Sequence, residues 1–168
     1  MDNYRYNEYI HGMAKDILTE LKQRKPFTCR EEELYLNILR SSDLLGRRMG
    51  EVLKALDLSS TQYNVLRILR GAGSEGLACS EIGERMVTRD PDITRLLDRL
   101  EKRGMVARSR EKEDRRVVTA RITAAGLDLL KRLDEPVTQM HKAQLGHLEP
   151  KQQETLIRLL ESAREKLS

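Results

Sequence analysis

Aromatic residues and cysteines are scarce in this 168-residue sequence. Only 4% of the residues are aromatic, with no Trp and a single Phe, Phe27, so the core must consist mainly of aliphatic side chains, which suits packed helices. The two cysteines, Cys29 and Cys79, are too few for a disulfide framework or a zinc ligand set. No run of about 18 apolar residues exists, and the N-terminus lacks the basic and then apolar pattern of a signal peptide. We therefore expect a cytoplasmic protein with reduced thiols and no membrane partner.

The motifs of common enzyme classes are also missing. The sequence contains no G-x-x-x-x-G-K-S/T loop, no G-x-S-x-G elbow and no H-E-x-x-H pair. The three histidines, His11, His141 and His147, are isolated and poorly spaced for one metal ion. We expect a protein that is not an enzyme and needs no cofactor or metal, with an enzyme kept as an alternative.

Charged residues, in contrast, make up 35% of the chain. The net charge is only +4, but the segment from Arg95 to Arg121 holds ten Lys or Arg residues against five Asp or Glu. The net positive charge is therefore concentrated in this segment, where it could neutralise the phosphates of a nucleic acid. A solvated charged helix followed by a salt-bridged hairpin would produce the same pattern.

Two helices are expected in the N-terminal third. A weaker helix is predicted from Asn7 to Arg24, before Pro26. A capping box of Thr28 and Glu31 then predicts the start of a helix whose apolar stripe runs to Leu56, for about 42 Å at 1.5 Å per residue. Such a long stripe needs a partner surface, in the same chain or in another. The apolar positions of the first helix are Ile10, Met13, Ile17 and Leu21.

A short helix, a tight turn and a second helix follow. Ser59 and Gln62 repeat the capping-box pattern and predict a helix from Ser60 to about Arg70, broken by the segment 71–76. Leu77 and Ala78 could form a brief strand before a two-turn helix that ends near Val87.

The next helix has the clearest apolar face in the sequence. Asp90 precedes Pro91 and is predicted to cap its N-terminus, and Gly104 is in the position that stops a helix. Asp92 could complement the helix dipole or accept a hydrogen bond from a cytosine amine, and the sequence does not decide between the two. The buried face is predicted to consist of Ile93, Leu96, Leu97 and Leu100.

A β-hairpin and two more helices complete the predicted order. The hairpin strands are expected over 105–110 and 116–122. Thr123 is predicted to cap a long helix in which Pro136 should cause a kink or a break, and a last helix is expected from about Pro150. The order predicts a mainly α fold with a small β-hairpin wing, that is, a winged helix-turn-helix with a helical dimerisation region.

The residues around the hairpin resemble a known family. Asp114-x-Arg116, five residues, then Ile122-Thr123 and Gly126 match the D-x-R-x5-L-T-x-x-G signature of the multiple-antibiotic-resistance regulator (MarR) family, with Ile in place of the usual Leu. The segment 93–104 is similar to the recognition helix of that family, and the resemblance covers about Glu31 to Ser168. It implies a homodimeric transcription regulator, most commonly a repressor, that binds a pseudo-palindromic double-stranded DNA operator.

The resemblance also implies a division of the chain and a set of DNA contacts. Residues 1–27 would form an extension, 28–58 a dimerisation helix, 59–123 the winged helix-turn-helix and 124–168 the C-terminal dimerisation helices. Arg116 would be the wing arginine that enters the minor groove, and Asp114 the acid that orients it, although Asp114 could be a simple turn residue and Arg95 a partner of Asp98 or Glu101. The implied DNA-binding residues are Arg89, Asp90, Asp92, Thr94, Arg95, Arg99, Asp114, Arg115 and Arg116.

An effector is also implied, because many relatives sense small aromatic or anionic molecules between the dimer helices and the winged domain. Tyr35, Arg47 and Tyr63 could line such a crevice here, or the tyrosines could belong to the core and its rim. Cys29, at a helix N-terminus, could be redox-sensitive or merely structural. A winged helix used only for protein interaction or dimerisation remains a rival interpretation, but the adjacent Arg115 and Arg116 favour DNA.

Overall fold

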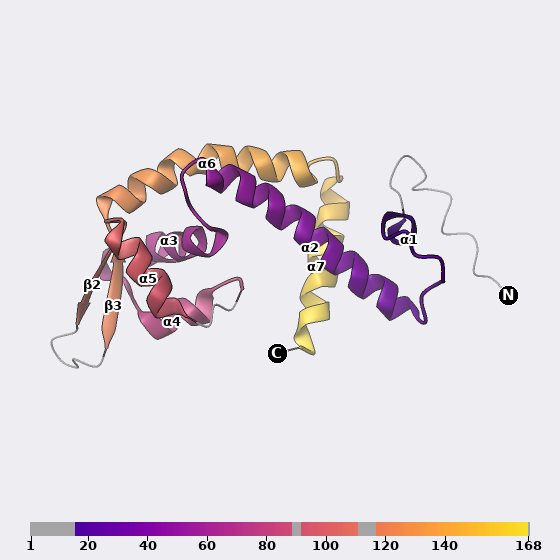
Figure 1. Ribbon diagram of the computed structural model, residues 1–168, viewed down its shortest axis with the longest axis horizontal. Helices are drawn as coiled ribbons and strands as arrows, with labels where there is room; N and C mark the ends of the chain where they lie inside the picture. The colour runs from indigo at the N-terminus through magenta and orange to yellow at the C-terminus, as the bar shows by residue number, and fades with distance from the viewer. Residues whose placement is uncertain (1–15, 89–91, 111–116, 168) are drawn as a thin grey trace. The chain divides into compact units, whose positions relative to one another are not determined.

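The computed structural model describes residues 16–88, 92–110 and 117–167 (Figure 1). Contacts between residues divide the chain into two compact units, 1–45 and 46–168, and each unit is described by itself. No helix in the described part of the chain is long and apolar enough to cross a membrane.

The first unit contains a short helix α1, Ile17–Glu20. Asp16 caps it by accepting a hydrogen bond from the Thr19 N–H at 2.7 Å, and Ile17 is buried. Because the backbone is extended at Asp16 and the helix ends at Glu20, the prediction of one helix from Asn7 to Arg24 is wrong. The predicted apolar positions Ile10 and Met13 lie outside the described residues, and Leu21 is exposed.

The long helix α2 covers Arg30–Lys54. It begins one residue later than a cap at Thr28 predicts, and the Thr28 N–H donates to the Glu32 carboxylate at 2.8 Å instead of to Glu31. After Lys54 the chain turns, with the Leu58 N–H donating to the Leu53 carbonyl at 3.2 Å and Asp57 in the left-handed region at φ 50°. Within the first unit, the Arg40 guanidinium pairs with the Glu20 carboxylate of α1 at 3.0 Å.

The second unit holds the helix-turn-helix, which starts with α3, Ser60–Ala72. The predicted capping box is confirmed, since the Ser59 N–H donates to Gln62 Oε1 at 3.0 Å and the Gln62 N–H to Ser59 Oγ at 3.1 Å. The helix runs through Gly71, where a break was expected, and a 3₁₀ turn follows at Gly73–Glu75. Strand β1 (Leu77–Ala78) and helix α4 (Cys79–Arg85) confirm the predicted strand and two-turn helix.

Helix α5, Ile93–Lys102, leads into a hairpin formed by β2 (Val106–Arg110) and β3 (Val118–Ile122). The sheet is antiparallel in the order β1-β3-β2, so β3 lies in the middle and pairs Val106 with Ile122 and Arg110 with Val118. Figure 1 shows α3, α4, α5 and this hairpin gathered together. The order confirms the predicted winged helix-turn-helix.

Aliphatic side chains form the core of the second unit, as the scarcity of aromatic residues predicted. Leu53 at the end of α2 is fully buried, so the last turns of this helix belong to the core of the winged domain. The other large, fully buried side chains are Leu66, Leu69, Ile82, Leu97, Leu100, Leu130, Leu133, Val65 and Val106.

Two helices follow the hairpin, α6 (Ala124–Leu145) and α7 (Pro150–Glu165). Thr123 caps α6 as predicted, with its hydroxyl accepting from the Gly126 N–H at 3.2 Å. Helix α6 continues through Pro136 without the break that was offered as one outcome. A Cβ at Gly126 would lie 2.5 Å from the Met105 carbonyl oxygen, so the signature glycine allows α6 to start close against the hairpin.

Candidate nucleic-acid interface

The start of α5 is fixed by an aspartate, although not by the expected one. Asp92 is the N-cap, and its carboxylate accepts a hydrogen bond from the Arg95 N–H at 3.0 Å. The prediction that Asp90 caps this helix is therefore wrong, because the helix begins at Ile93 and a good capping residue stands directly before it. Asp90 and Arg89 lie outside the described residues. Of the two roles considered for Asp92, the structure supports the one at the helix terminus.

The two faces of α5 differ as predicted. Leu96, Leu97 and Leu100 are buried, and Ile93 packs against the same core. Thr94, Arg95 and Arg99 are exposed. Gly104, at φ 71°, follows the last turn in the conformation that a helix-stopping glycine adopts. The exposed polar residues thus sit on a helix held in one orientation by its leucines.

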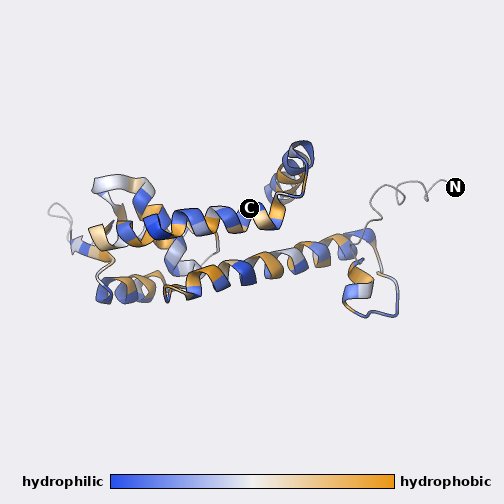
Figure 2. Cartoon of the chain, turned by 90° about the horizontal axis from the view of Figure 1, so that it is seen from above, coloured by the Kyte–Doolittle hydropathy of each residue, from blue (hydrophilic) through white to orange (hydrophobic). Residues whose placement is uncertain are grey.

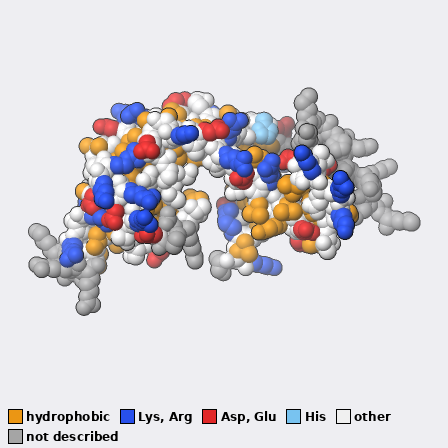
Figure 3. Space-filling model, in the orientation of Figure 1, with side chains coloured by type: hydrophobic (Ala, Val, Ile, Leu, Met, Phe, Trp, Pro, Cys, Tyr) orange, Lys and Arg blue, Asp and Glu red, His pale blue; other side chains and the backbone are white. Residues whose placement is uncertain are grey.

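Arg108 of strand β2 ties the hairpin to α5. Its Nη2 lies 2.5 Å from Asp98 Oδ1 and 2.6 Å from Glu101 Oε2, and its Nε lies 3.0 Å from Glu101 Oε2. The Arg108 N–H also donates to Glu101 Oε1 at 3.0 Å. Hydrogen bonding to Arg108 holds the pKa of Glu101 below its ordinary value. Figure 3 shows acidic and basic side chains mixed over this part of the winged domain.

The Arg108 cluster shows which charged side chains of α5 form ion pairs. Asp98 and Glu101 were the acids expected to pair with Arg95 if that residue were only part of a surface salt bridge. Both acids instead bind Arg108, and within the described residues neither Arg95 nor Arg99 forms an ion pair. Both acids of the helix are thus engaged by one guanidinium of the hairpin, while Arg95 and Arg99 are exposed.

The wing can be described only at its base. Arg121 of β3 donates from Nε to the Ser74 carbonyl at 3.2 Å and from Nη1 to Ser109 Oγ at 2.8 Å, so it braces the 3₁₀ turn and β2. Asp114, Arg115 and Arg116, predicted to act at the wing tip, lie outside the described residues.

The three predicted effector residues fall in two different units. Tyr35 belongs to the first unit and is exposed. Tyr63 belongs to the second, where it is only 6% exposed, and burial raises the pKa of its phenol. The Arg67 guanidinium lies 5.8 Å from the centroid of the Tyr63 ring. Arg47 is an exposed residue of α2. The effector role of Tyr35, Arg47 and Tyr63 stays a prediction.

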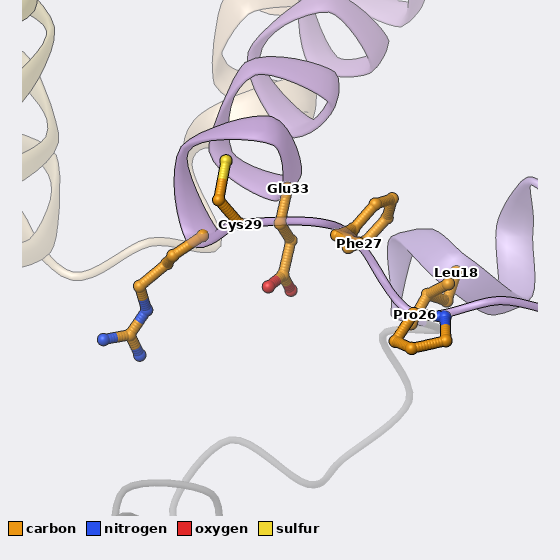
Figure 4. A pocket seen from close by; sticks show the side chains of 6 residues that line it. Leu18, Pro26, Phe27, Cys29 and Glu33 are labelled. Atoms are coloured by element: carbon orange, nitrogen blue, oxygen red, sulfur yellow. The ribbon is translucent and has the colours of Figure 1, made fainter.

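Cys29 is exposed just before α2, beside a surface cavity of about 420 Å³ in the first unit (Figure 4). The cavity is formed by Leu18 of α1, the segment with Pro26 and Phe27, and the first turn of α2 with Glu33. Cys79 lies in the second unit, and partial burial raises the pKa of its thiol. Within the described residues, no group of three His, Cys, Asp or Glu side chains could hold a metal ion.

Comparison with known proteins agrees with this geometry. The model of the MarR family matches residues 58–118, from the α3 cap to the start of β3. The chain is 46% identical to a MarR transcription factor from Planctomyces limnophilus, with a TM-score of 0.64 over 81% of this chain and 98% of that one. The chain belongs to the MarR family of transcription regulators.

Other relatives extend the match. PrsX, an HTH-type transcriptional regulator of Escherichia coli, is 30% identical over 82% of this chain and 84% of its own length. A MarR C80S mutant from E. coli, solved with operator DNA, is 24% identical and has a TM-score of 0.71 over 89% of this chain and 99% of that one. This MarR-family chain is thus a DNA-binding transcription regulator and not an enzyme.

The roles of two arginines at the interface were not predicted from the sequence. Arg108 had a local signal, since alternation along β2 places it on the same side of the strand as the buried Val106. Arg103, the C-cap of α5, donates to the carbonyls of Leu56 and Asp57, which lie 46 or more positions earlier. No local pattern predicts a contact over such a separation.

Proposed function

We propose that two copies of this chain form a homodimer that places the N-terminal half of each α5 in the major groove of a pseudo-palindromic operator. The observation that carries this proposal is the division of charge on α5. Its two central acids are bound by Arg108, while Thr94, Arg95 and Arg99 are exposed. The crystal structures of E. coli MarR C80S and Staphylococcus aureus MepR with DNA support the proposal by their fold.

The homodimer follows from apolar surface that the single chain leaves exposed. Figure 2 shows hydrophobic residues recurring along α2, and Leu34 is 59% exposed. Helix α7 has no buried residue, and Leu159 is 64% exposed. Residues 28–58 and 124–168 would supply the dimer contacts, and 59–123 the DNA contacts, with 1–27 as an extension. Two recognition helices would then lie about one DNA turn, or about 34 Å, apart.

The contacts would divide between bases and backbone. Arg95 stands in the first turn of α5, from which its guanidinium can reach the edge of a guanine, and Arg99 lies one turn further on. Arg89, Arg115 and Arg116 are proposed to reach bases or phosphates, Asp90 to face the bases, and Asp114 to orient Arg116. Asp92 would position Arg95 through the cap.

We further propose that the protein is a cytoplasmic repressor released by a small aromatic or anionic effector. Among the relatives, IacR of Pseudomonas putida is an HTH-type transcriptional repressor. DNA binding by BpsR of Bordetella bronchiseptica is regulated by 6-hydroxynicotinic acid, a small aromatic acid. Tyr35, Arg47 and Tyr63 are the residues proposed to respond to such a molecule.

Footprinting on DNA that flanks the protein's own gene tests the proposal. We expect two protected half-sites related by a pseudo-twofold axis, with protection reduced by an aromatic anion such as 6-hydroxynicotinate. Benzyl alcohol, which has a ring without a charge, is the matched control. Uniform coating without a preferred site would contradict sequence-specific binding, and protection unchanged by a panel of aromatic anions would contradict only the effector part.

A further inference from the structure

Two separate contacts hold the C-terminal end of α5, and one of them is made to the turn that follows the long helix α2. On the first side, Thr123 at the start of α6 donates from its hydroxyl to the Gly104 carbonyl at 2.7 Å, and its N–H donates to the Met105 carbonyl at 3.0 Å. On the second side, the Arg103 guanidinium reaches the turn that ends α2. The end of α5 is therefore bonded both to the residue that caps α6 and to the turn that follows α2.

Around the turn that follows α2, Leu53 and Leu58 share a core with the leucines of α5, and the Arg103 guanidinium adds the polar contact. Arg103 Nη2 donates to the Leu56 carbonyl at 3.1 Å, and Nη1 donates to the Asp57 carbonyl. The Asp57 carboxylate is 3.9 Å from Nη1 but fully exposed, so the charge pair adds little to these two bonds. A planar guanidinium can hold two carbonyls in a fixed arrangement, whereas an ammonium group cannot. The two bonds therefore fix the orientation of the turn relative to the end of α5 as well as the distance between them.

The turn to which Arg103 donates these bonds is itself strained. Asp57 has φ 50°, in the left-handed region that a side chain other than glycine rarely adopts, and such a residue costs about 1 kcal/mol or more. A strained turn persists when its surroundings determine it, and here the two Arg103 bonds add to the backbone bonds that Leu56, Asp57 and Leu58 donate to residues 53 and 54. Without Arg103, the turn between α2 and α3 would keep its apolar packing but lose its two hydrogen bonds to the end of α5.

We infer that Arg103 is a positioning residue that fixes the recognition helix relative to the dimerisation helix, and so sets the half-site spacing that the dimer accepts. This inference rests on the proposed homodimer and operator. In a rigid dimer, one extra base pair between half-sites moves a recognition helix about 3.4 Å and about 34° out of register. A loosened joint would tolerate that change. Arg103 would therefore act on spacing, whereas Arg95 acts on base identity.

The test measures affinity for an operator and for the same operator with one base pair inserted between the half-sites. Arg103→Met should reduce the ratio of the two affinities by about threefold to tenfold, the equivalent of one ordinary hydrogen bond. Arg103→Lys is the charge-matched variant. It should keep the salt dependence of binding yet also lose spacing discrimination, because the rotatable donors of an ammonium do not hold two carbonyls in a fixed arrangement.

Two results would overturn the inference. One is that both variants keep the wild-type ratio, even if overall affinity falls. The other comes from a measurement without DNA, in which hydrogen exchange of the Asp57 and Leu58 amides is followed in the intact dimer. Arg103→Met should accelerate this exchange, and Lys102→Met, which removes the same charge from the preceding exposed position, should not. If the two amides exchanged at the same rate in Arg103→Met and Lys102→Met, Arg103 would not hold the turn. This result does not depend on whether the wild-type protein binds an operator.

Discussion

The winged domain and the long helix α2 bury their apolar residues in opposite ways. In the winged domain, Leu97 of α5 and Leu66 of α3 are inaccessible to solvent, and their helices close a core within one chain. In the first unit, the apolar stripe of α2 is largely exposed, including Leu34 and Ile38. The winged domain thus closes its core within one chain, whereas α2 would bury its apolar stripe only against a second copy, as proposed above. Changes in the two regions should therefore respond differently to protein concentration.

The largest effect is expected in the winged core. Leu97→Ala removes a fully buried side chain and leaves a cavity, which should lower the free energy of unfolding by about 2–5 kcal/mol. Chemical denaturation of the variant and the wild-type protein measures this loss. Because Leu97 packs within one chain, the loss should stay the same over a hundredfold range of protein concentration. A loss that disappeared at high concentration would contradict a self-contained core.

A smaller and concentration-dependent effect is expected on α2. Leu34→Ser removes an apolar side chain from the proposed dimer surface and should weaken dimerisation by about 1.5–3 kcal/mol for each copy. Sedimentation equilibrium measures the dissociation constant. Val87→Ser is the matched control, since Val87 is an exposed apolar residue of the winged domain and should leave dimerisation unchanged. If both variants had the same dissociation constant as the wild-type protein, a dimer formed through α2 would be contradicted.

The Arg108 cluster should affect DNA binding more than stability. Arg108→Gln leaves Asp98 and Glu101 uncompensated on the recognition helix, so phosphate repulsion should lower the affinity for any DNA. Adding Glu101→Gln to this variant removes one uncompensated charge and should restore part of the affinity. Titration by fluorescence anisotropy at low and high salt measures both effects. No recovery in the double variant would show that the loss comes from a disturbed hairpin instead.

The smallest effect concerns pH. The Arg108 hydrogen bonds lower the pKa of Glu101 from its ordinary value of 4.5, so ionised Glu101 stabilises the fold above that pH. This contribution is lost as the pH falls through the lowered pKa. The stability difference between wild type and Glu101→Gln should therefore be constant above about pH 5 and shrink below pH 4.5, as followed by denaturation at each pH. A stability difference that grew as the pH fell would contradict a lowered pKa of Glu101.

Local patterns predicted most of the fold. The Ser59–Gln62 capping box, the Thr123 cap, the Gly104 stop and the apolar face of α5 all depend on neighbours within one or two turns. The errors came from competing local signals. Pro91 favoured Asp90 as the cap, but Asp92 formed it, and at Thr28 the carboxylate of Glu32 competed with the nearer Glu31.

The candidate site was less predictable because its decisive contacts join different elements. Arg108 reaches back from β2 to two acids of α5, and Arg103 reaches back to the end of α2. The charge count between Arg95 and Arg121 detected a basic region but did not show which charges neutralise one another. The structure separates Arg108 and Arg103, which hold the domain together, from the exposed Arg95 and Arg99.

The central claim, that α5 reads a DNA sequence, is tested most directly by titrating Arg95→Ala and Arg116→Ala against the operator and against random DNA at two salt concentrations. We predict that Arg95→Ala lowers operator affinity more than random affinity, by about 1–3 kcal/mol for a lost guanine contact. Arg116→Ala should lower both affinities by similar factors and flatten the salt dependence, because minor-groove and phosphate contacts depend little on sequence. If Arg95→Ala changed neither affinity, α5 would not be the reading helix and the account would be wrong.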